Sequence, residues 1–249
     1  MDTLYYDMIF KRKSFHIFSG TKRLSVDELQ EIQNQALTLV PLDKNIRTAF
    51  RLVPRNQTTC RRGEYCILIY SEPKEHHLQN AGYMAEQLDL WLASKNIGVC
   101  WYGMGRTDQA KYDGLDFVIM LAIEKVEETK FRKDYTKAKR KKTEEIWEGN
   151  PLGNVAPVAR YAPSACNTQP WLVERIDNEL KLFRVSGKRG MMPKNKVSFY
   201  NCIDLGIFML FLELCLEHES YCYMRKLYPD SKDAKGRYPT ASYEISANV

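Results

Sequence analysis

The sequence predicts an α+β protein made of two related halves in tandem. Of its 249 residues, 44% are hydrophobic and 12% aromatic, a composition typical of a globular chain. The order helix, strand, long apolar helix, strand occurs twice. A charged segment around residues 125–147 separates the two copies. We therefore expect an N-terminal half over residues 1–147 and a C-terminal half over residues 148–249.

In the first half, Ser25 and Glu28 form a capping-box pattern before a helical apolar spacing, which predicts a helix over residues 26–38. Short β-rich apolar runs predict the strands, and the run FVIMLAI at 117–123 is apolar on both faces, so we expect it to be central in its sheet. The expected elements after the first helix are a strand over 62–70, a long helix over 78–96, and strands over 99–102 and 117–123.

The second half repeats the pattern with a turn at Asp177-Asn178. Its expected elements are a helix near 155–161, strands over 171–176 and 180–185, a long helix over 199–217, and strands over 221–227 and 241–245. The long helices over 78–96 and 199–217 are apolar around most of their circumference. We expect these two helices to pack together as the pseudo-symmetric centre of the molecule.

Charge is unevenly distributed along the chain. The formal net charge is +6, and the run Lys130–Lys142 alone carries eight basic residues and one acid. The rest of the chain is therefore almost neutral, and the run is expected to be a solvated helix or linker. A nucleic-acid binder usually spreads cations and aromatic residues over a folded face, so binding of RNA by this run is the weaker alternative.

Compartment and membrane signals are few. The N-terminal sequence MDTLYYDMIF lacks the basic and apolar segments of a signal peptide, so a cytosolic protein is expected. The longest near-apolar run, Ile207–Leu216, is too short to span a bilayer, which predicts no membrane partner. Seven cysteines form no Cys-x-x-Cys pair and are expected to be reduced, mostly buried thiols.

The sequence offers little for metal or nucleophilic catalysis, because it has four histidines and no metal-ligand or hydrolase motif. Two segments remain that could carry chemistry. The first is the basic opening over residues 11–18, in which Arg12 and Lys13 precede Ser14 and His16. A guanidinium, an ammonium and a hydroxyl this close together could surround a phosphate. The alternative is an ordinary solvated basic run.

The second segment is the loop over residues 161–171, between a helix and a strand. Pro163 and Pro170 stiffen it, and small side chains let a planar ligand approach its backbone. Polar atoms for a heteroaromatic rim come from Ser164, Asn167 and Gln169. The alternative is an ordinary turn with an Asx cap at Asn167. Spacing alone does not decide between the two.

Three stretches carry a resemblance to a known family. The run APSACNTQPW at 162–171 closely resembles the Ala-Pro-Ser-x-x-Asn-x-Gln-Pro-Trp signature of the FMN-dependent nitroreductase family. The opening RKSFHIF at 12–18 is similar to that family's Arg-Arg-Ser-x-Arg-x-Phe motif, and GYMAEQLDLWLASKNIGVCWYG at 82–103 is similar to its core helix and following strand. About 145 residues separate the opening from the Pro-Ser motif, which resembles the duplicated single-chain branch, the TM nitroreductase type.

The resemblance implies a fold in which two α+β halves imitate a homodimer that clasps flavin mononucleotide (FMN) at its interface. It places Arg12, Lys13, Ser14 and His16 at the FMN phosphate and ribityl chain, and Pro163, Ser164, Ala165 and Asn167 along the isoalloxazine. The family's C-terminal Lys/Arg pair for the phosphate has no evident counterpart here, and Lys194 and Lys196 could substitute for it.

By resemblance, the function is an FMN-dependent oxidoreductase that moves hydride from NADH or NADPH to a small electrophile such as a nitroaromatic or a quinone. The flavin carries the chemistry, so no catalytic side chain is nominated. Backbone N–H groups near Tyr102, Gly103 and Gly105 are expected at the flavin N5/O4 edge. The chain is expected to be a monomer or weak dimer, and a non-catalytic flavin-binding protein with a degenerate site is the alternative.

Overall fold

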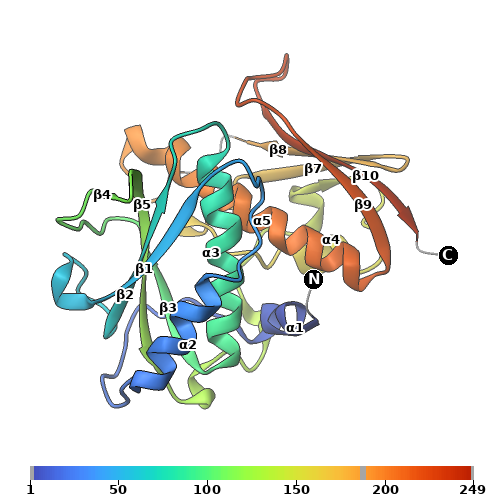
Figure 1. Cartoon of the computed structure of the whole chain (residues 1–249). Coiled ribbons are helices and arrows are strands. Elements are labelled where there is room, and N and C mark those ends of the chain that lie inside the picture. The colour runs from blue at the N-terminus through green and yellow to red at the C-terminus, as the bar shows by residue number, and fades with distance from the viewer. Residues whose placement is uncertain (1–2, 186–188, 248–249) are drawn as a thin grey trace.

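A computed structural model describes residues 3–185 and 189–247. Two β-sheets flank a pair of long helices, α3 (His77–Ser94) and α5 (Val197–His218). Figure 1 shows α3 and α5 side by side at the centre, with one sheet on each side of the pair. The α+β class and the central pairing of the two long helices predicted from the sequence are confirmed.

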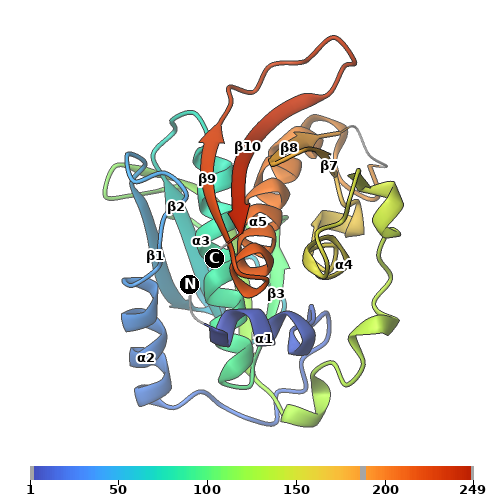
Figure 2. The ribbon, with the colours of Figure 1, turned by 90° about the vertical axis from the view of Figure 1, so that its right-hand side faces the viewer.

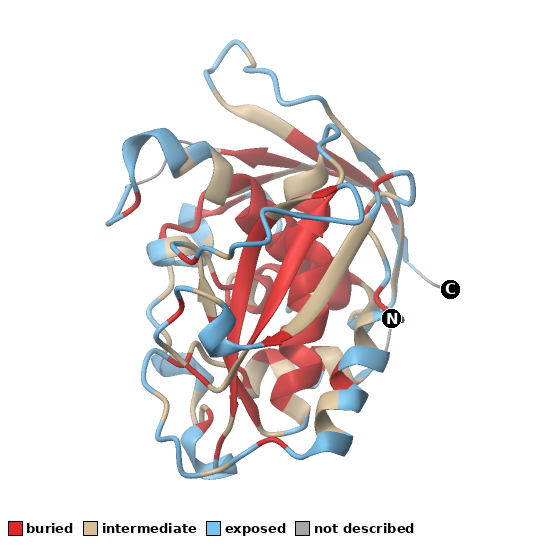
Figure 3. Cartoon of the chain, turned by 60° about the vertical axis from the view of Figure 1, so that its left-hand side comes forward, coloured by how far each residue is buried: buried red, intermediate tan, exposed pale blue. Residues whose placement is uncertain are grey.

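The first sheet is antiparallel, with strand order β1-β2-β5-β3 and the short β4 paired to β5. The strand β5 lies between β2 and β3, so the prediction of a central strand at 117–123 is confirmed. Figure 3 shows β2 and β5 almost entirely buried. The strands are β1 (Thr48–Pro54), β2 (Tyr65–Ser71), β3 (Ile97–Tyr102), β4 (Lys111–Tyr112) and β5 (Leu115–Lys125).

The second sheet has the order β6-β7-β8-β10-β9, and every pair in it is antiparallel except β6 with β7. Exposure alternates along β9, so one face of this sheet is open to solvent near that strand. The predicted boundary at residues 147/148 falls inside β6. The strands are β6 (Trp147–Glu148), β7 (Trp171–Ile176), β8 (Glu179–Arg184), β9 (Tyr221–Leu227) and β10 (Tyr238–Ala247).

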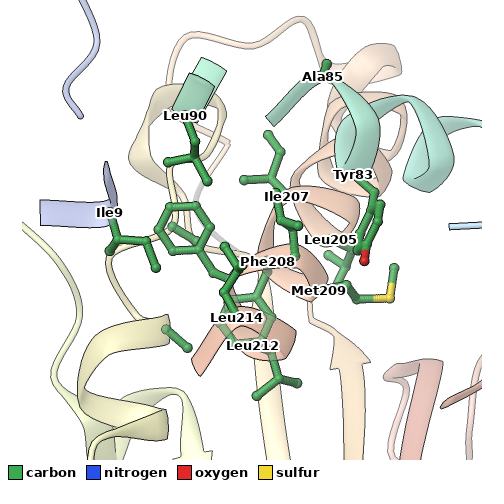
Figure 4. Packing of buried hydrophobic residues seen from close by; sticks show 14 of the residues in the cluster. Ile9, Tyr83, Ala85, Leu90, Leu205, Ile207, Phe208, Met209, Leu212 and Leu214 are labelled. Carbon is green, nitrogen blue, oxygen red and sulfur yellow. The ribbon is translucent and has the colours of Figure 1, made fainter. Parts of the chain in front are cut away.

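The helices α3 and α5 cross with their backbones in close approach at two glycines. A methyl group added to Gly82 would lie 2.2 Å from the carbonyl oxygen of Ile203, and one added to Gly206 would lie 1.9 Å from that of Gln79. Only glycine permits this approach. Large apolar side chains of α5 pack around the crossing, among them Leu205, Ile207 and Phe208, which Figure 4 shows. The Phe208 ring stacks on Trp171 of β7.

Three shorter helices complete the fold, α1 (Thr3–Lys11), α2 (Val26–Ala36) and α4 (Val155–Ala159). The capping box at Ser25 and Glu28 is present at the start of α2, as predicted. The sequence analysis did not predict β1, whose residues are half-buried apart from Val53 and Pro54. Such a strand lacks both the apolar run of a central strand and a clean two-residue alternation.

The prediction that the run Ile207–Leu216 is too short to span a bilayer needs correction, because this run is part of a longer helix. By length and composition alone, Lys194–His218 could cross a membrane. However, 94% of its most apolar window is buried inside the protein. Its apolar surface is therefore accounted for by packing against α3, α4 and the second sheet.

The basic segment, residues 130–142, is a linker containing 3-10 turns rather than an α-helix. Figure 2 shows this stretch running along the edge of the molecule, from below α1 up toward α4. It is not uniformly solvated, because Phe131 is buried and Arg132, Arg140 and Lys141 are partly covered. The prediction of a linker is confirmed, and the prediction that the whole run is solvated is wrong.

Candidate functional site

The basic opening follows α1 and lies along the edge strand β3. Ser14 forms a parallel bridge with Val99, and the backbone N–H of Phe15 donates to the Val99 carbonyl at 2.9 Å. The Phe15 ring covers Gly98, where an added methyl group would lie 2.9 Å from the ring. This contact fixes the backbone, so the side chains of residues 12, 14 and 16 are held beside the end of β3.

Arg12 is buried, with 3% of its surface exposed. Its Nε and Nη2 donate to Asp89 Oδ2 at 2.9 and 2.8 Å, and its Nε lies 3.4 Å from Glu86 Oε1. Trp101 Nε1 donates to the same Asp89 oxygen at 2.9 Å. Burial alone would lower the pKa of Arg12, but the two carboxyl groups raise it, so the guanidinium stays charged. For this residue, the solvated alternative is wrong.

Lys13, Ser14 and His16 are more accessible than Arg12. Burial lowers the pKa of Lys13, and the nearby charges of Lys130 and Arg132 lower it further. His16 lies with Nδ1 at 2.9 Å from Nη1 of Arg62, and its pKa is lowered by partial burial and by Arg62. The opening therefore lies in a positively charged environment with a neutral imidazole at its end.

Two arginines of the basic segment extend this environment. Burial and the charge of Arg12 lower the pKa of both Arg132 and Arg140 to about 10. Arg140 donates to the Tyr161 carbonyl and to Asn167 Oδ1. Among the described residues, no carboxylate lies within ion-pair distance of Arg132 or Arg140. The charge of Glu86 favours the charged form of Arg140 from beyond ion-pair distance, whereas Arg132 has no such carboxyl group among the described residues. A half-buried cation without a counterion is costly, which is typical of a site for an anion.

The loop over residues 161–171 is held from behind by α5 and from the side by the basic segment. The backbone N–H of Ala165 donates to Asp204 Oδ1 at 2.9 Å, and Ser164 Oγ accepts from the N–H of Gln169 at 2.9 Å. The Asn167 side chain donates to the Lys139 carbonyl in addition to binding Arg140. Asn167 is therefore tied to the basic segment rather than acting as an Asx cap.

Backbone strain is concentrated in this loop. Cys166, Asn167 and Gln169 all have positive φ angles of 48–55°. Non-glycine residues adopt this conformation at a cost of about 1–3 kcal/mol each, and such residues cluster at ligand-binding sites. Pro163 is buried, whereas Ser164 and Ala165 remain partly accessible. The loop therefore presents a fixed backbone to the solvent side.

The turn at the end of β3 lies against α5. The hydroxyl of Tyr200 donates to the Gly103 carbonyl at 2.6 Å, and a methyl group at Gly103 would lie 2.7 Å from the Tyr200 ring. The N–H of Gly105 donates to the Tyr102 carbonyl within the turn. Tyr102 and Gly103 are partly accessible, while Gly105 is buried.

Several buried polar atoms near these segments have no hydrogen-bond partner within the protein. They are both carboxyl oxygens of Glu86, Asn201 Oδ1, Asp204 Oδ2 and Trp171 Nε1. Burial raises the pKa of Glu86 well above its usual range and that of Asp204 to about 8. Unpaired buried polar atoms are rare, so those of Glu86 beside Arg12 and of Asp204 behind the Pro-Ser loop mark this region as a candidate functional site.

Comparison with known proteins identifies the family. A family profile described as "Putative TM nitroreductase" matches residues 5–215. The chain belongs to this nitroreductase family. The predicted resemblance is thus confirmed. A crystal structure of a putative nitroreductase from Thermotoga maritima superposes with a TM-score of 0.62 and 18% sequence identity, covering 96% of this chain and 93% of that one. At this identity the match shows the nitroreductase fold.

Two other solved structures match a smaller part of the chain. A putative nitroreductase from Desulfovibrio desulfuricans, in complex with FMN, is 14% identical and covers 60% of this chain and 99% of that one, with a TM-score of 0.43. A putative NADH oxidase from Clostridium acetobutylicum is 15% identical and covers 56% and 97%, with a TM-score of 0.44. A search of curated proteins finds no match.

In this nitroreductase-family chain, Arg140 connects the two predicted binding segments. It donates to Asn167 of the Pro-Ser loop and, besides the effect of burial, its pKa is lowered by Arg12 of the opening and raised by Glu86. The sequence analysis missed Glu86, Asp89, Arg132 and Arg140. Glu86 and Asp89 are the only acidic or basic residues in α3 apart from His77, and that signal could have identified them. Lys194 and Lys196 are exposed at the start of α5.

Proposed function

We propose that this nitroreductase-family protein is an FMN-dependent oxidoreductase that takes hydride from NADH or NADPH and reduces a small electrophile such as a nitroaromatic or a quinone. The observation that carries the proposal is the pair of half-buried arginines, Arg132 and Arg140, between the opening and the Pro-Ser loop. Neither guanidinium forms an ion pair with a carboxylate among the described residues, although Glu86 raises the pKa of Arg140 from beyond ion-pair distance. A phosphate would supply the missing counterion.

The donor set fits FMN. Arg132 and the nearby Lys13 would hold the phosphate. The charge of Arg132 lowers the pKa of Lys13, and a phosphate bound between the two cations would offset this repulsion. The Nε and Nη2 atoms of Arg12 are already bound to Asp89, so Arg12 supports the opening and contributes charge. The Pro-Ser loop, with its strained backbone at Cys166 and Asn167, would lie along the isoalloxazine. The bound flavin supplies the hydride chemistry.

The protein's own residues orient the cofactor and limit access of water. Asp204 and Arg140 fix the Pro-Ser loop from two sides, and Tyr200 fixes the β3 turn through the Gly103 carbonyl. Asp204 and Tyr200 belong to the packed helix α5, so the parts of the site that they hold do not need to reorganise when a ligand arrives. No group of three or more His, Cys, Asp or Glu side chains in the described parts of the chain could hold a metal ion.

The direct test is FMN binding followed by turnover. The purified chain, titrated with FMN, should quench flavin fluorescence with a dissociation constant in the micromolar range or below, and the complex should oxidise NADH or NADPH in air. Absence of binding at tens of micromolar FMN, about −6 kcal/mol, would contradict the proposal. Binding without oxidation of either nucleotide would instead favour the non-catalytic flavin-binding alternative.

The phosphate assignment is tested with Arg132→Ala. This change should weaken FMN by about tenfold to a hundredfold, the range for a charge-assisted hydrogen bond of about 1.5–3 kcal/mol, and leave riboflavin affinity nearly unchanged. Lys194→Ala, which removes an exposed cation at the start of α5, is the matched control and should alter neither affinity. Equal losses for both flavins would show that Arg132 acts through folding.

A further inference from the structure

The proposed flavin site lies at one junction between the two halves, formed by Arg12, Arg132 and the Pro-Ser loop. An internal repeat relates this first junction to a second one. The strand order β1-β2-β5-β3 of the first sheet matches the order β7-β8-β10-β9 of the second. Along the chain, the long helix α3 follows β2, and the long helix α5 follows β8, which is the counterpart of β2. An offset of 124 residues relates Gly82 to Gly206 and the left-handed Asn96 to Ser220. Each glycine faces a carbonyl three residues before the other glycine, and such reciprocal contact defines a two-fold axis.

The same offset relates the groups that hold the two loops. Asn80 Oδ1 accepts the N–H of Asp43 at 3.1 Å, just as Asp204 Oδ1 accepts the N–H of Ala165. The loop over residues 41–43 is therefore the structural counterpart of the Pro-Ser loop over 163–165. A symmetric molecule would bind a ligand at each loop, once at each junction.

At the second junction, hydrogen-bonded side chains of the protein occupy the position that corresponds to the cationic site of the first junction. Glu213, the counterpart of Asp89, accepts hydrogen bonds from the hydroxyls of Tyr83, Tyr223 and Tyr243 at 2.7, 3.0 and 2.9 Å. Arg225, the counterpart of Trp101, donates to Glu213 at 2.5 Å and to the Leu42 carbonyl at 2.7 Å. This network, the Glu213 cluster, ties the loop over 41–43 directly to α5.

The corresponding positions at the first junction are apolar or open. At the same offset of 124 residues, Val99 is the counterpart of Tyr223, and Ile207 is the counterpart of Tyr83. The side chains of Val99 and Ile207 cannot donate a hydrogen bond. Leu42 is 5% exposed, whereas Ser164 in the counterpart loop is partly accessible. The cations also differ, because Arg225 forms an ion pair with Glu213, while Arg132 and Arg140 form none with a carboxylate among the described residues.

From these contacts we infer that the Glu213 cluster closes the second junction, so that each chain binds a single flavin, at the junction formed by Arg12, Arg132 and the Pro-Ser loop. This inference rests on the proposed function for the identity of the ligand. The closure of the second junction stands on the hydrogen bonds alone. The burial of Tyr83 and Tyr243, together with the charge of Glu213, raises the pKa of both hydroxyls, which keeps them as donors.

Equilibrium dialysis of the full chain against FMN tests the stoichiometry. One FMN per chain is expected at saturation, and Arg132→Ala should weaken that single site at least tenfold. A stoichiometry of two, or one undiminished site that persists in Arg132→Ala, would overturn the inference. Tyr243→Phe alters only the second junction, so it should leave both the number of bound flavins and their affinity unchanged.

Chemical denaturation of the flavin-free chain tests the closure separately. Tyr243→Phe should lower the folding equilibrium constant by about tenfold, about 1.4 kcal/mol, because Glu213 loses a buried donor. Tyr112→Phe, at a tyrosine that is 40% exposed, is the matched control and should have little effect. Unchanged stability of Tyr243→Phe would overturn the closure. If FMN fails to bind at all, the proposed function and the single-flavin stoichiometry fail, and this measurement still decides the closure.

Discussion

The helices α3 and α5 are alike where their backbones cross and hold a loop, and different at the carboxylate that follows the crossing. Both carry a glycine at the crossing and a polar side chain two residues earlier that holds a loop backbone. Seven residues after each glycine stands a carboxylate, Asp89 in α3 and Glu213 in α5. Asp89 binds an arginine of the opening, whereas Glu213 binds tyrosines and Arg225. Backbone packing thus restricts the helices to one geometry, while the chemistry at their ends is free to differ.

The largest expected effect is at the two carboxylates. Asp89→Ala should lower the free energy of unfolding by about 3–5 kcal/mol, because Arg12 is left buried with only Glu86 nearby. Glu213→Ala should cost a similar amount, since it leaves Arg225 without its carboxylate. Urea denaturation of both variants measures this. Glu31→Ala, which breaks an exposed ion pair with Lys95, is the control and should cost less than about 1 kcal/mol.

If the Asp89 variant lost no more stability than this control, Arg12 would not need its partner, and the difference between the two junctions would lie elsewhere.

The glycine crossing is expected to give the next largest effect. Gly206→Ala and Gly82→Ala each force a methyl group onto a carbonyl oxygen of the facing helix, at 1.9 and 2.2 Å. Backbone atoms in a packed core move little, so each variant should lose about 2–3 kcal/mol. Thermal or urea unfolding would measure both. A loss confined to one of the two variants would contradict the reciprocal, two-fold contact.

Asp204, which holds the Pro-Ser loop, predicts that the stability of the chain depends on pH. Burial raises the pKa of Asp204 to about 8, so the folded chain keeps a proton that the unfolded chain releases near pH 4. Stability should therefore fall as pH rises from about 4 to about 8, with a contribution of at most about 1.4 kcal/mol per pH unit. Asp204→Asn, which installs the amide already present at Asn80, should remove that slope.

The reciprocal change, Asn80→Asp, provides the matched comparison and should introduce a slope of the same sign. Denaturation midpoints measured at several pH values would show both. Identical pH dependence in the parent chain and Asp204→Asn would mean that Asp204 is ionised when folded.

The smallest effect is expected at Lys194 and Lys196. Both are exposed, so replacing either by alanine should change stability by less than about 0.5 kcal/mol and FMN affinity by less than twofold. Isothermal titration with FMN would measure the affinity. A fivefold loss at either lysine would restore the sequence-based prediction that these residues substitute for the family's phosphate pair.

Most of the elements could be predicted from the sequence because they follow apolar periodicity and capping. The strands 171–176 and 221–227 agree with β7 and β9 in both bounds. The strand β1 was missed because its residues are half-buried, a state without a distinctive pattern. Short motifs likewise located the opening and the Pro-Ser loop.

The cationic part of the site could not be predicted in the same way. In sequence, Arg132 and Arg140 belong to a run of similar residues, and only the path of the linker decides which of them are covered. Partial burial of a cation depends on tertiary contacts, here with the opening and with Tyr161. The charge pairing of Arg12 by Asp89, 77 residues away, was also outside the reach of local patterns.

The reciprocal crossing of Gly82 and Gly206 has a consequence for how such a molecule can change over generations. In a homodimer, every substitution appears on both sides of the axis, so a change that improves one site also alters its copy. With both glycines in one chain, each side of the axis has its own codons. A tyrosine can then be selected at position 223 while position 99 stays valine. A spare binding site can in this way become a stabilising core without harm to the site that remains.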